Sequence, residues 1–131
     1  MADPTLNNYI RNTMRDDATI RGLTAETVSP YGVYYQHPKK DVEPSLITFS
    51  TIARSREAQI SQMMIIGITA WGDNFEEIQN TVYDLFHKTA PVLIDYRILI
   101  MKFIGSSPEL WDERLQCFYR QDRYQIILAR D

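Results

Sequence analysis

The chain has 131 residues, of which 44% are hydrophobic and 24% charged, with only five glycines and six prolines. This length and composition predict a single domain over residues 1–131 with one hydrophobic core, and they exclude a disordered, fibrous or disulfide-rich protein. The net charge of −3 argues against a protein that binds free nucleic acid, because such proteins usually carry a basic excess.

The same sequence predicts a soluble protein that is made in the cytoplasm. Cys117 is the only cysteine, so no disulfide can form within the chain and a reducing compartment is expected. The first four residues have neither the basic nor the apolar region of a secretion signal. The longest apolar run, residues 98–104, contains Lys102 and is too short to cross a bilayer, so no membrane partner is expected.

The first predicted element is a helix that begins at Pro4 behind Asp3, because proline is tolerated in the first turn and Asp is a good N-cap. We expect it to end near Asp16 and Asp17, since carboxylates are unfavourable at a helix C-terminus. Its apolar residues recur at spacings of three and four and predict a core-facing stripe: Leu6, Tyr9, Ile10 and Met14.

Residues 27–36 are the next candidate element. They are rich in strand formers but contain Pro30 and Gly32, a pattern typical of an edge strand or of a strand with a bulge. A polar loop is expected to follow over residues 37–44. This first strand should therefore lie at the border of a sheet.

A β-hairpin is predicted after that loop. Residues 46–52 form its first strand and residues 60–71 its return strand, which includes an unbroken apolar segment at residues 63–66. The charged residues 54–57 should form the tip between the two strands.

The clearest local signal is an amphipathic helix that follows Asp73 and ends before Pro91. Asp73 and Glu76 have the spacing of a capping box, in which each side chain accepts a hydrogen bond from the other residue's backbone amide. Acidic residues lie at the start of the helix and His87 and Lys88 at its end, as the helix dipole favours. The apolar stripe has helical period: Phe75, Ile78, Val82, Leu85 and Phe86.

Two strands complete the predicted fold. Residues 93–104 are dense in apolar residues and favour a central strand, and residues 118–129 form the last strand, with a bulge or tight turn at 121–122. Residues 105–116, which include Trp111, are expected to connect them. The order α-β-β-β-α-β-β predicts an α+β fold, with two amphipathic helices packed on one face of a small antiparallel or mixed sheet.

The sequence contains no recognisable catalytic, metal or cofactor motif. The glycine spacings of phosphate-binding loops and of the hydrolase nucleophile elbow are absent. His37, His87 and Cys117 are too scattered to suggest a metal cluster, and Cys117 is expected to be a small buried residue. Asp84 and His87 could form an acid/base pair, but a surface ion pair is the simpler interpretation. We therefore expect a protein that is not an enzyme and holds no cofactor.

Charged loops and an aromatic edge strand are the candidate contact residues. A solvated loop explains the charges as well as a partner does. Aromatic residues are enriched at interfaces, and an open sheet edge invites pairing with a neighbour. The residues expected at a subunit interface are Tyr34, Tyr35, His37, Lys39, Lys40, Asp41, Arg54, Arg56 and Glu57.

Three blocks of the chain resemble the tail-completion and tail-terminator proteins of long-tailed bacteriophages. The first is the opening helix with residues 28–35, the second the strand that enters a helix at residues 66–78, and the third the closing strand at residues 123–129. Their order and spacing match the family over nearly the whole chain. The connection at residues 105–116 is longer than the family pattern.

The resemblance implies a structural virion protein that acts in head-tail joining. Such proteins form a homo-oligomeric ring, usually a hexamer, on the head-proximal end of the tail tube, where they stop tube polymerisation. The implied partners are other copies of the chain, the tail tube protein and a neck or head-completion protein. DNA would pass through the ring only as cargo, and the protein would be assembled in the host cytoplasm into the virion.

Two other classes of function are also compatible with the sequence. The chain could be a small ligand-binding or regulatory α+β domain that dimerises through its sheet, or an enzyme without a recognisable motif. The native mass separates the first two hypotheses, because a hexamer supports the ring and a stable dimer supports the regulatory domain.

Overall fold

The computed structural model describes residues 4–24, 33–35, 45–54, 61–87 and 96–130. Its centre is a six-stranded sheet in the order β1-β2-β3-β6-β4, and β5 also pairs with β6. β1 and β2 are parallel, whereas the other pairs are antiparallel, so the sheet is mixed. The strands are β1 (Val33–Tyr35), β2 (Leu46–Arg54), β3 (Ser61–Trp71), β4 (Tyr96–Ser106), β5 (Leu110–Asp112) and β6 (Cys117–Arg130).

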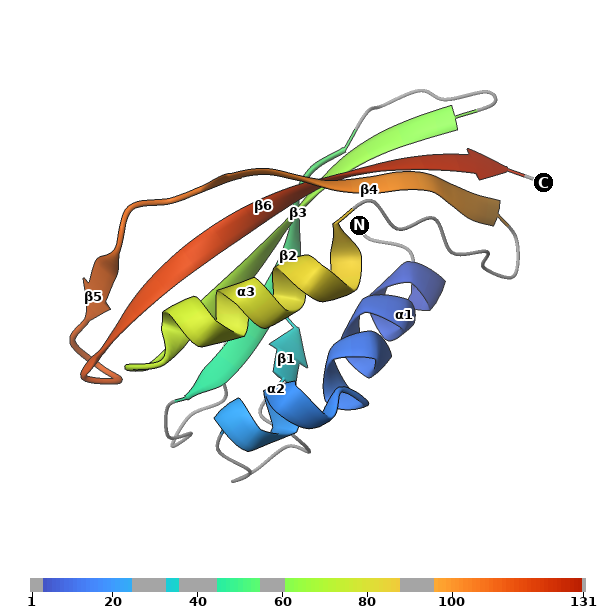
Figure 1. Ribbon diagram of the computed structural model, residues 1–131. Helices are drawn as coiled ribbons and strands as arrows, with labels where there is room; N and C mark the ends of the chain where they lie inside the picture. The colour runs from blue at the N-terminus through green and yellow to red at the C-terminus, as the bar shows by residue number, and fades with distance from the viewer. Residues whose placement is uncertain (1–3, 25–32, 36–44, 55–60, 88–95, 131) are drawn as a thin grey trace.

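In the described ranges, three helices lie on one face of this sheet (Figure 1): α1 (Pro4–Arg15), α2 (Ala18–Leu23) and α3 (Phe75–Phe86). The predicted α+β class is confirmed, as are the two predicted helices. The short helix α2 was not predicted. It begins because Asp17 is an N-cap whose carboxylate accepts a hydrogen bond from the Ile20 amide over 3.0 Å. The carboxylate expected to end one helix thus also starts the next.

The helices and the inner face of the sheet share one hydrophobic core. Tyr124 of β6 is fully buried in it, and its ring packs edge-to-face against Phe86 of α3 and Phe103 of β4. Such aromatic pairs add to the stabilisation from area burial alone. The predicted helical stripes supply much of the rest: Leu6, Ile10, Met14, Ile78, Val82 and Phe86 are buried.

The predicted hairpin and edge strand are confirmed where the structure describes them. β2 and β3 are antiparallel, with Leu46 opposite Trp71. β1 lies at one end of the strand order, next to β2. The remainder of the predicted edge strand, the loop at 37–44 and most of the charged tip at 54–57 lie outside the described residues.

Two predictions about the last strands were wrong. β4, expected to be central, lies at the other end of the strand order, and β3 and β6 occupy the centre. No bulge occurs in β6 at Gln121 or Asp122, because β6 pairs with β3 in continuous register from Tyr119 to Ala129. The register shifts fall instead in β2 and β4, where bulges are common beside sheet edges.

The segment expected to be a plain connection contains β5, which pairs with β6. A turn joins the two strands: the Leu115 amide donates to Oδ1 of Asp112 over 2.8 Å, and Gln116 has a positive φ of 55°. Residues 109–119, which we call the arm, therefore form a small hairpin at the end of the long strand β6 (Figure 1).

Candidate interaction surfaces

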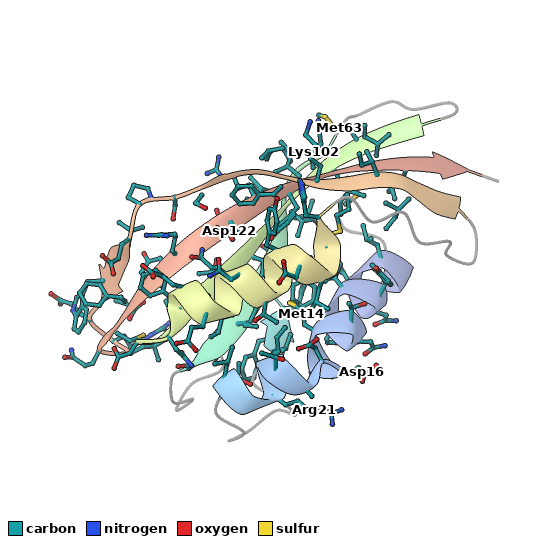
Figure 2. All side chains as sticks on the ribbon, viewed as in Figure 1. Met14, Asp16, Arg21, Met63, Lys102 and Asp122 are labelled. Atoms are coloured by element: carbon teal, nitrogen blue, oxygen red, sulfur yellow. The ribbon has the colours of Figure 1, made fainter. Side chains whose placement is uncertain are left out.

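The face of the sheet opposite the three helices, which we call the outer face, is formed by every second residue of the strands. In β3 the buried Met64, Ile66 and Ile68 face the helices, so Met63 and Ile65 point the other way. Figure 2 shows Met63 and Lys102 on the side of the sheet away from the helices.

Large aliphatic side chains are exposed on the outer face. Ile52, Met63 and Ile104 are 41%, 37% and 44% exposed. Ile52 and Ile104 sit at the register shifts of β2 and β4, and bulges re-aim side chains in this way. Groups of exposed apolar side chains are typical of interaction surfaces, so the outer face is a candidate interaction surface.

The register places part of this cluster in one row across the sheet. A Cβ atom added to Gly67 of β3 would come within 2.6 Å of Ile52 Cδ1, so the Ile52 side chain lies across this glycine. Gly67 pairs with Arg123 of β6, and Arg123 pairs with Gly105 of β4, the residue after Ile104. The absence of a side chain at position 67 gives Ile52 the space to reach the middle of the sheet.

The charged groups on this surface are basic. Lys102 and Arg123 are both exposed. No acidic side chain occurs among the outer-face positions whose side chains the structure describes in β2, β3, β4 and β6. We call Ile52, Met63, Lys102, Ile104 and Arg123 together the outer patch.

Side-chain hydrogen bonds hold the outer face in a defined shape. Gln125 donates to the Met63 sulfur over 2.9 Å, and Trp71 Nε1 donates to Thr48 Oγ1 over 3.0 Å. Trp71 also stacks on Tyr119, with ring centroids 4.4 Å apart. These contacts order the outer face around Met63 and at the Trp71 end of β3.

The arm carries a second exposed apolar group. Leu110, Trp111 and Phe118 are 42%, 48% and 41% exposed. The Trp111 and Phe118 rings, opposite each other in the register, meet edge-to-face with centroids 4.8 Å apart. Tryptophan that is half exposed at the end of a hairpin has the character of an interface anchor.

Acidic residues surround these aromatic rings. Glu109 and Glu113 are exposed and Asp112 is half-buried, whereas the only basic residue among positions 109–119 is Arg114. The arm is thus apolar and acidic, whereas the outer patch is apolar and basic. Sequence reasoning missed both surfaces, although the apolar residues within the charged segment 109–118 were a readable signal for the arm.

Most of the predicted interface residues cannot be placed. His37, Lys39, Lys40, Asp41, Arg56 and Glu57 lie outside the described residues, and Arg54 ends β2 without a described side chain. Tyr34 is only 4% exposed and packs with Leu46 and Trp71. Tyr35 is half-buried and packs edge-to-face on Phe49. Tyr34 therefore offers little surface to a partner, in contrast to its predicted role.

The predicted capping box of Asp73 and Glu76 was also wrong. The N-cap of α3 is Asn74, and its side chain makes no capping hydrogen bond. The Asn74 side chain bonds elsewhere, accepting from the Ser45 hydroxyl and donating to the Leu23 carbonyl over 2.8 Å. It thereby joins α3 to the start of β2 and the end of α2, while Asp73 and Glu76 are exposed.

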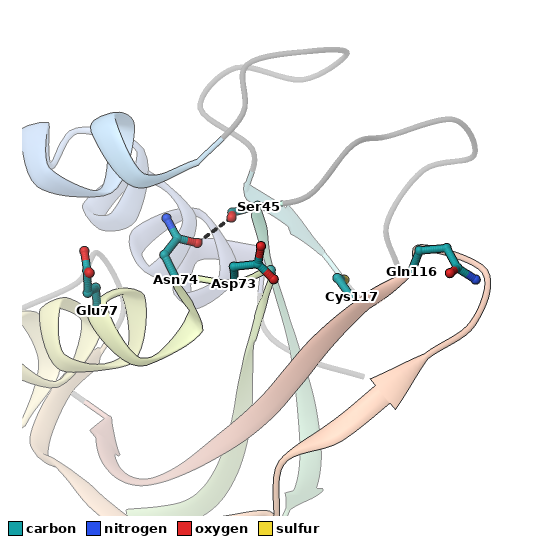
Figure 3. Close-up of a pocket in the computed structure, with 7 residues that line it drawn as sticks. Ser45, Asp73, Asn74, Glu77, Gln116 and Cys117 are labelled. Atoms are coloured by element: carbon teal, nitrogen blue, oxygen red, sulfur yellow. Dashed lines mark hydrogen bonds between the residues drawn. The ribbon is translucent and has the colours of Figure 1, made fainter.

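A pocket of about 470 Å³ lies at the start of α3, lined by Ser45, Asp73, Asn74, Glu77 and Cys117 among others (Figure 3). Cys117 is buried, as predicted. Burial, followed by the nearby carboxylates of Asp112 and Asp73, raises the pKa of its thiol. A protonated buried thiol is a poor nucleophile, so the pocket does not present an activated cysteine.

Two polar groups at the contact between α3 and the sheet have structural partners. Asp122 is 4% exposed and its Oδ1 accepts from Gln79 Nε2 over 2.8 Å and from Ser106 Oγ over 2.6 Å. His87 Nδ1 accepts from the Phe103 amide over 3.1 Å. The imidazole therefore joins the end of α3 to β4, which agrees with a structural role for His87.

Within the described ranges, no group of three or more His, Cys, Asp or Glu side chains could hold a metal ion. Likewise, no helix in the described part of the chain is long and apolar enough to cross a membrane.

Comparison with known proteins establishes the fold. No protein-family model and no curated protein matches the chain. A chain in a solved structure described as "Virion of native gene transfer agent (GTA) particle" superposes with a TM-score of 0.72 and 13% sequence identity. The match covers 92% of this chain and 91% of that chain. At this identity the similarity shows that the two chains share a fold.

Proposed function

We propose that this chain is a structural subunit of a phage-like virion. The observation that carries the proposal is the fold similarity to a chain of a gene transfer agent virion, with a TM-score of 0.72 over about nine tenths of both chains. Because the match covers about nine tenths of each chain and not a single motif, the similarity concerns the whole fold.

More specifically, we propose that the chain forms a ring on the head-proximal end of a tail tube and joins the tail to the neck. The sequence blocks that resemble tail-terminator proteins support this role. The second block runs from β3 into α3 and the third lies in β6. β3 and β6 are the central strands of the sheet and α3 packs on them. The resemblance therefore includes the central elements of the fold.

The surfaces of the subunit are compatible with such a ring. A ring requires two different patches on each subunit, because each subunit contacts its two neighbours through different faces. The outer patch and the arm are two separate exposed surfaces of this kind. The proposed partners are other copies of the chain, the tail tube protein and a neck protein, and DNA would pass through without specific binding.

The proposed role is not enzymatic. The buried or half-buried polar groups that could serve catalysis, Asp122 and His87, accept hydrogen bonds that hold α3 to the sheet, and burial raises the pKa of Cys117. Asp122 and His87 thus have structural roles that account for their positions.

Two measurements test the proposal. Native mass spectrometry and negative-stain electron microscopy of the purified chain should show hexameric rings, alone or on tail tubes. Addition of the chain to polymerising tail tubes should stop their elongation and leave a cap at one end. A stable dimer that does not bind tubes would support the regulatory domain instead, and rings that leave tube growth unchanged would contradict the terminator role.

A further inference from the structure

We propose that the arm of one copy of this chain docks on the outer patch of a second copy, with Trp111 and Phe118 against Ile52 and Ile104. The proposal deepens the proposed ring and rests on it for the identity of the partner. It names the two surfaces that meet and the chemistry of their contact.

The two surfaces cannot meet within one subunit. Phe118 shares its side of β6 with Arg120, whose guanidinium lies 5.1 Å from the centre of the Phe75 ring at the start of α3. Trp111, opposite Phe118, is therefore on the helix side of the sheet. The outer patch is on the other side, so the two surfaces do not cover each other within one subunit.

Charge complementarity favours a second copy as the partner of each surface. Among the described residues, the acidic side chains of the arm, Glu109, Asp112 and Glu113, have no ion-pair partner, and neither do Lys102 and Arg123 of the outer patch. Complementary potentials set the register and partner choice of an interface, while its apolar centre supplies most of the affinity. One chain carries both halves of such an interface.

The two surfaces also share an apolar character. The arm ends in the aromatic pair of Trp111 and Phe118. On the outer face the Ile52 side chain lies across Gly67 and is exposed, so it offers an aliphatic surface against which an aromatic ring can pack. Because arm and patch differ, the contact is heterologous, and it forms a ring when the rotation between successive copies closes.

Analytical ultracentrifugation of the full chain over a range of concentrations tests the proposal. We expect Trp111→Ser and Ile104→Asp each to weaken self-association by at least about 30-fold, the effect of losing an interface hot spot. Tyr83→Ser is the matched control, because Tyr83 is an aromatic residue with 38% exposure on α3, outside both surfaces. Unfolding curves of the variants verify that each remains folded.

A mixing experiment gives the sharpest outcome. Trp111→Ser keeps an intact outer patch and Ile104→Asp keeps an intact arm, so an equimolar mixture should form a one-to-one dimer and nothing larger. A mixture that remains monomeric, a Trp111→Ser variant that assembles like the wild type, or a wild-type chain that is monomeric at about 1 mM would each overturn the proposal. In the last case the surfaces would serve a different partner, such as the tube protein.

The failure of this proposal is distinguishable from the failure of the proposed function. If wild-type rings stop tube growth and the Trp111→Ser and Ile104→Asp variants form the same rings, the interface is wrong and the terminator role stands. If both variants lose assembly but wild-type rings leave tube growth unchanged, the interface stands and the terminator role is wrong.

Discussion

Gln79 and Asp122 form a hydrogen bond of 2.8 Å between the middle of α3 and the centre of the sheet. Both residues are buried, at 7% and 4% exposure, and Ser106 of β4 donates to the same carboxylate oxygen. One acidic group therefore connects α3 with the two strands β4 and β6. It lies on the inner face of the sheet, beside the apolar core around Tyr124.

The first prediction concerns the loss of this connection. Asp122→Ala should lower the free energy of unfolding by about 1 to 3 kcal/mol, because it removes the main acceptor of Gln79 and Ser106 in a buried site. Urea unfolding at neutral pH measures the change. Exposed Asp84 on α3 provides the control, since Asp84→Ala should change stability by less than about 0.5 kcal/mol.

The same carboxyl group predicts a pH dependence. Burial raises the pKa of Asp122, against the smaller opposite effects of the Ser106 hydrogen bond and of Arg120. The folded chain therefore binds this proton more tightly than the unfolded chain. The stabilisation that comes from the protonated Asp122 carboxyl group is fully present below the pKa of this group in the unfolded chain, which is about 4. It is lost as the pH rises through the higher pKa of the same group in the folded chain.

Asp122→Asn should remove this dependence, because an amide is not ionised and its oxygen can still accept from Gln79 and Ser106. Urea unfolding from pH 3.5 to 7 should show the wild type losing stability relative to Asp122→Asn as the pH rises. Parallel curves for the two proteins would show that the carboxyl group titrates equally in the folded and unfolded chains.

A third prediction separates Asn74 from its neighbour Asp73. Asn74→Ala should destabilise the fold by about 1 to 3 kcal/mol, since it removes a half-buried side chain that accepts from Ser45 and donates to Leu23. Asp73→Ala should cost less than about 0.5 kcal/mol, because Asp73 is exposed and is not the N-cap. Equal losses in thermal unfolding would restore a capping role for Asp73.

The parts of the fold that were predictable are those that a local pattern determines. The apolar stripes of α1 and α3 record which side of each helix is buried, and the runs of strand-forming residues in β2 and β3 predict the hairpin. The central position of β6 was not predictable in this way, because strand order depends on pairing between segments distant in sequence. Asp122 is an example: its charge led us to expect a bulge or a tight turn in the last strand, whereas β6 is continuous through this residue.

The candidate surfaces were harder to predict than the fold. Tyr34 belongs to a tyrosine-rich segment that looks like an interface, yet its ring packs within the subunit on Leu46 and Trp71. Trp111 lies in a segment whose apolar residues show no strong periodicity. β5 forms there because β6 extends far enough to pair with it. Exposure is a property of the assembled sheet, so an alternating pattern does not identify which face stays uncovered.

A fourth prediction follows from the buried thiol of Cys117. Burial and nearby carboxylates raise its pKa, so less thiolate is present at a given pH than for an exposed cysteine. In a colorimetric thiol assay at pH 8 the native chain should react at least about tenfold more slowly than the chain unfolded in urea. Equal rates would mean that the site opens faster than the reagent attacks.

The last prediction concerns the hydroxyl group of Tyr124. It is buried and has no hydrogen-bond partner among the described residues. Burial, followed by the negative charge of Asp122, raises its pKa, so the group stays protonated. A buried hydroxyl without a partner costs about 1 to 3 kcal/mol, while the ring itself stabilises the core through Phe86 and Phe103.

Tyr124→Phe should therefore leave the ring contacts intact and raise the free energy of unfolding by about 1 kcal/mol. Tyr124→Leu is the comparison that removes the ring contacts, and it should lower stability by about 1 to 3 kcal/mol, because a smaller side chain leaves part of the site empty. Urea unfolding of both variants at pH 7 measures the difference. A loss of stability in Tyr124→Phe would mean that the hydroxyl group has a partner, either an ordered water or a group from the undescribed part of the chain.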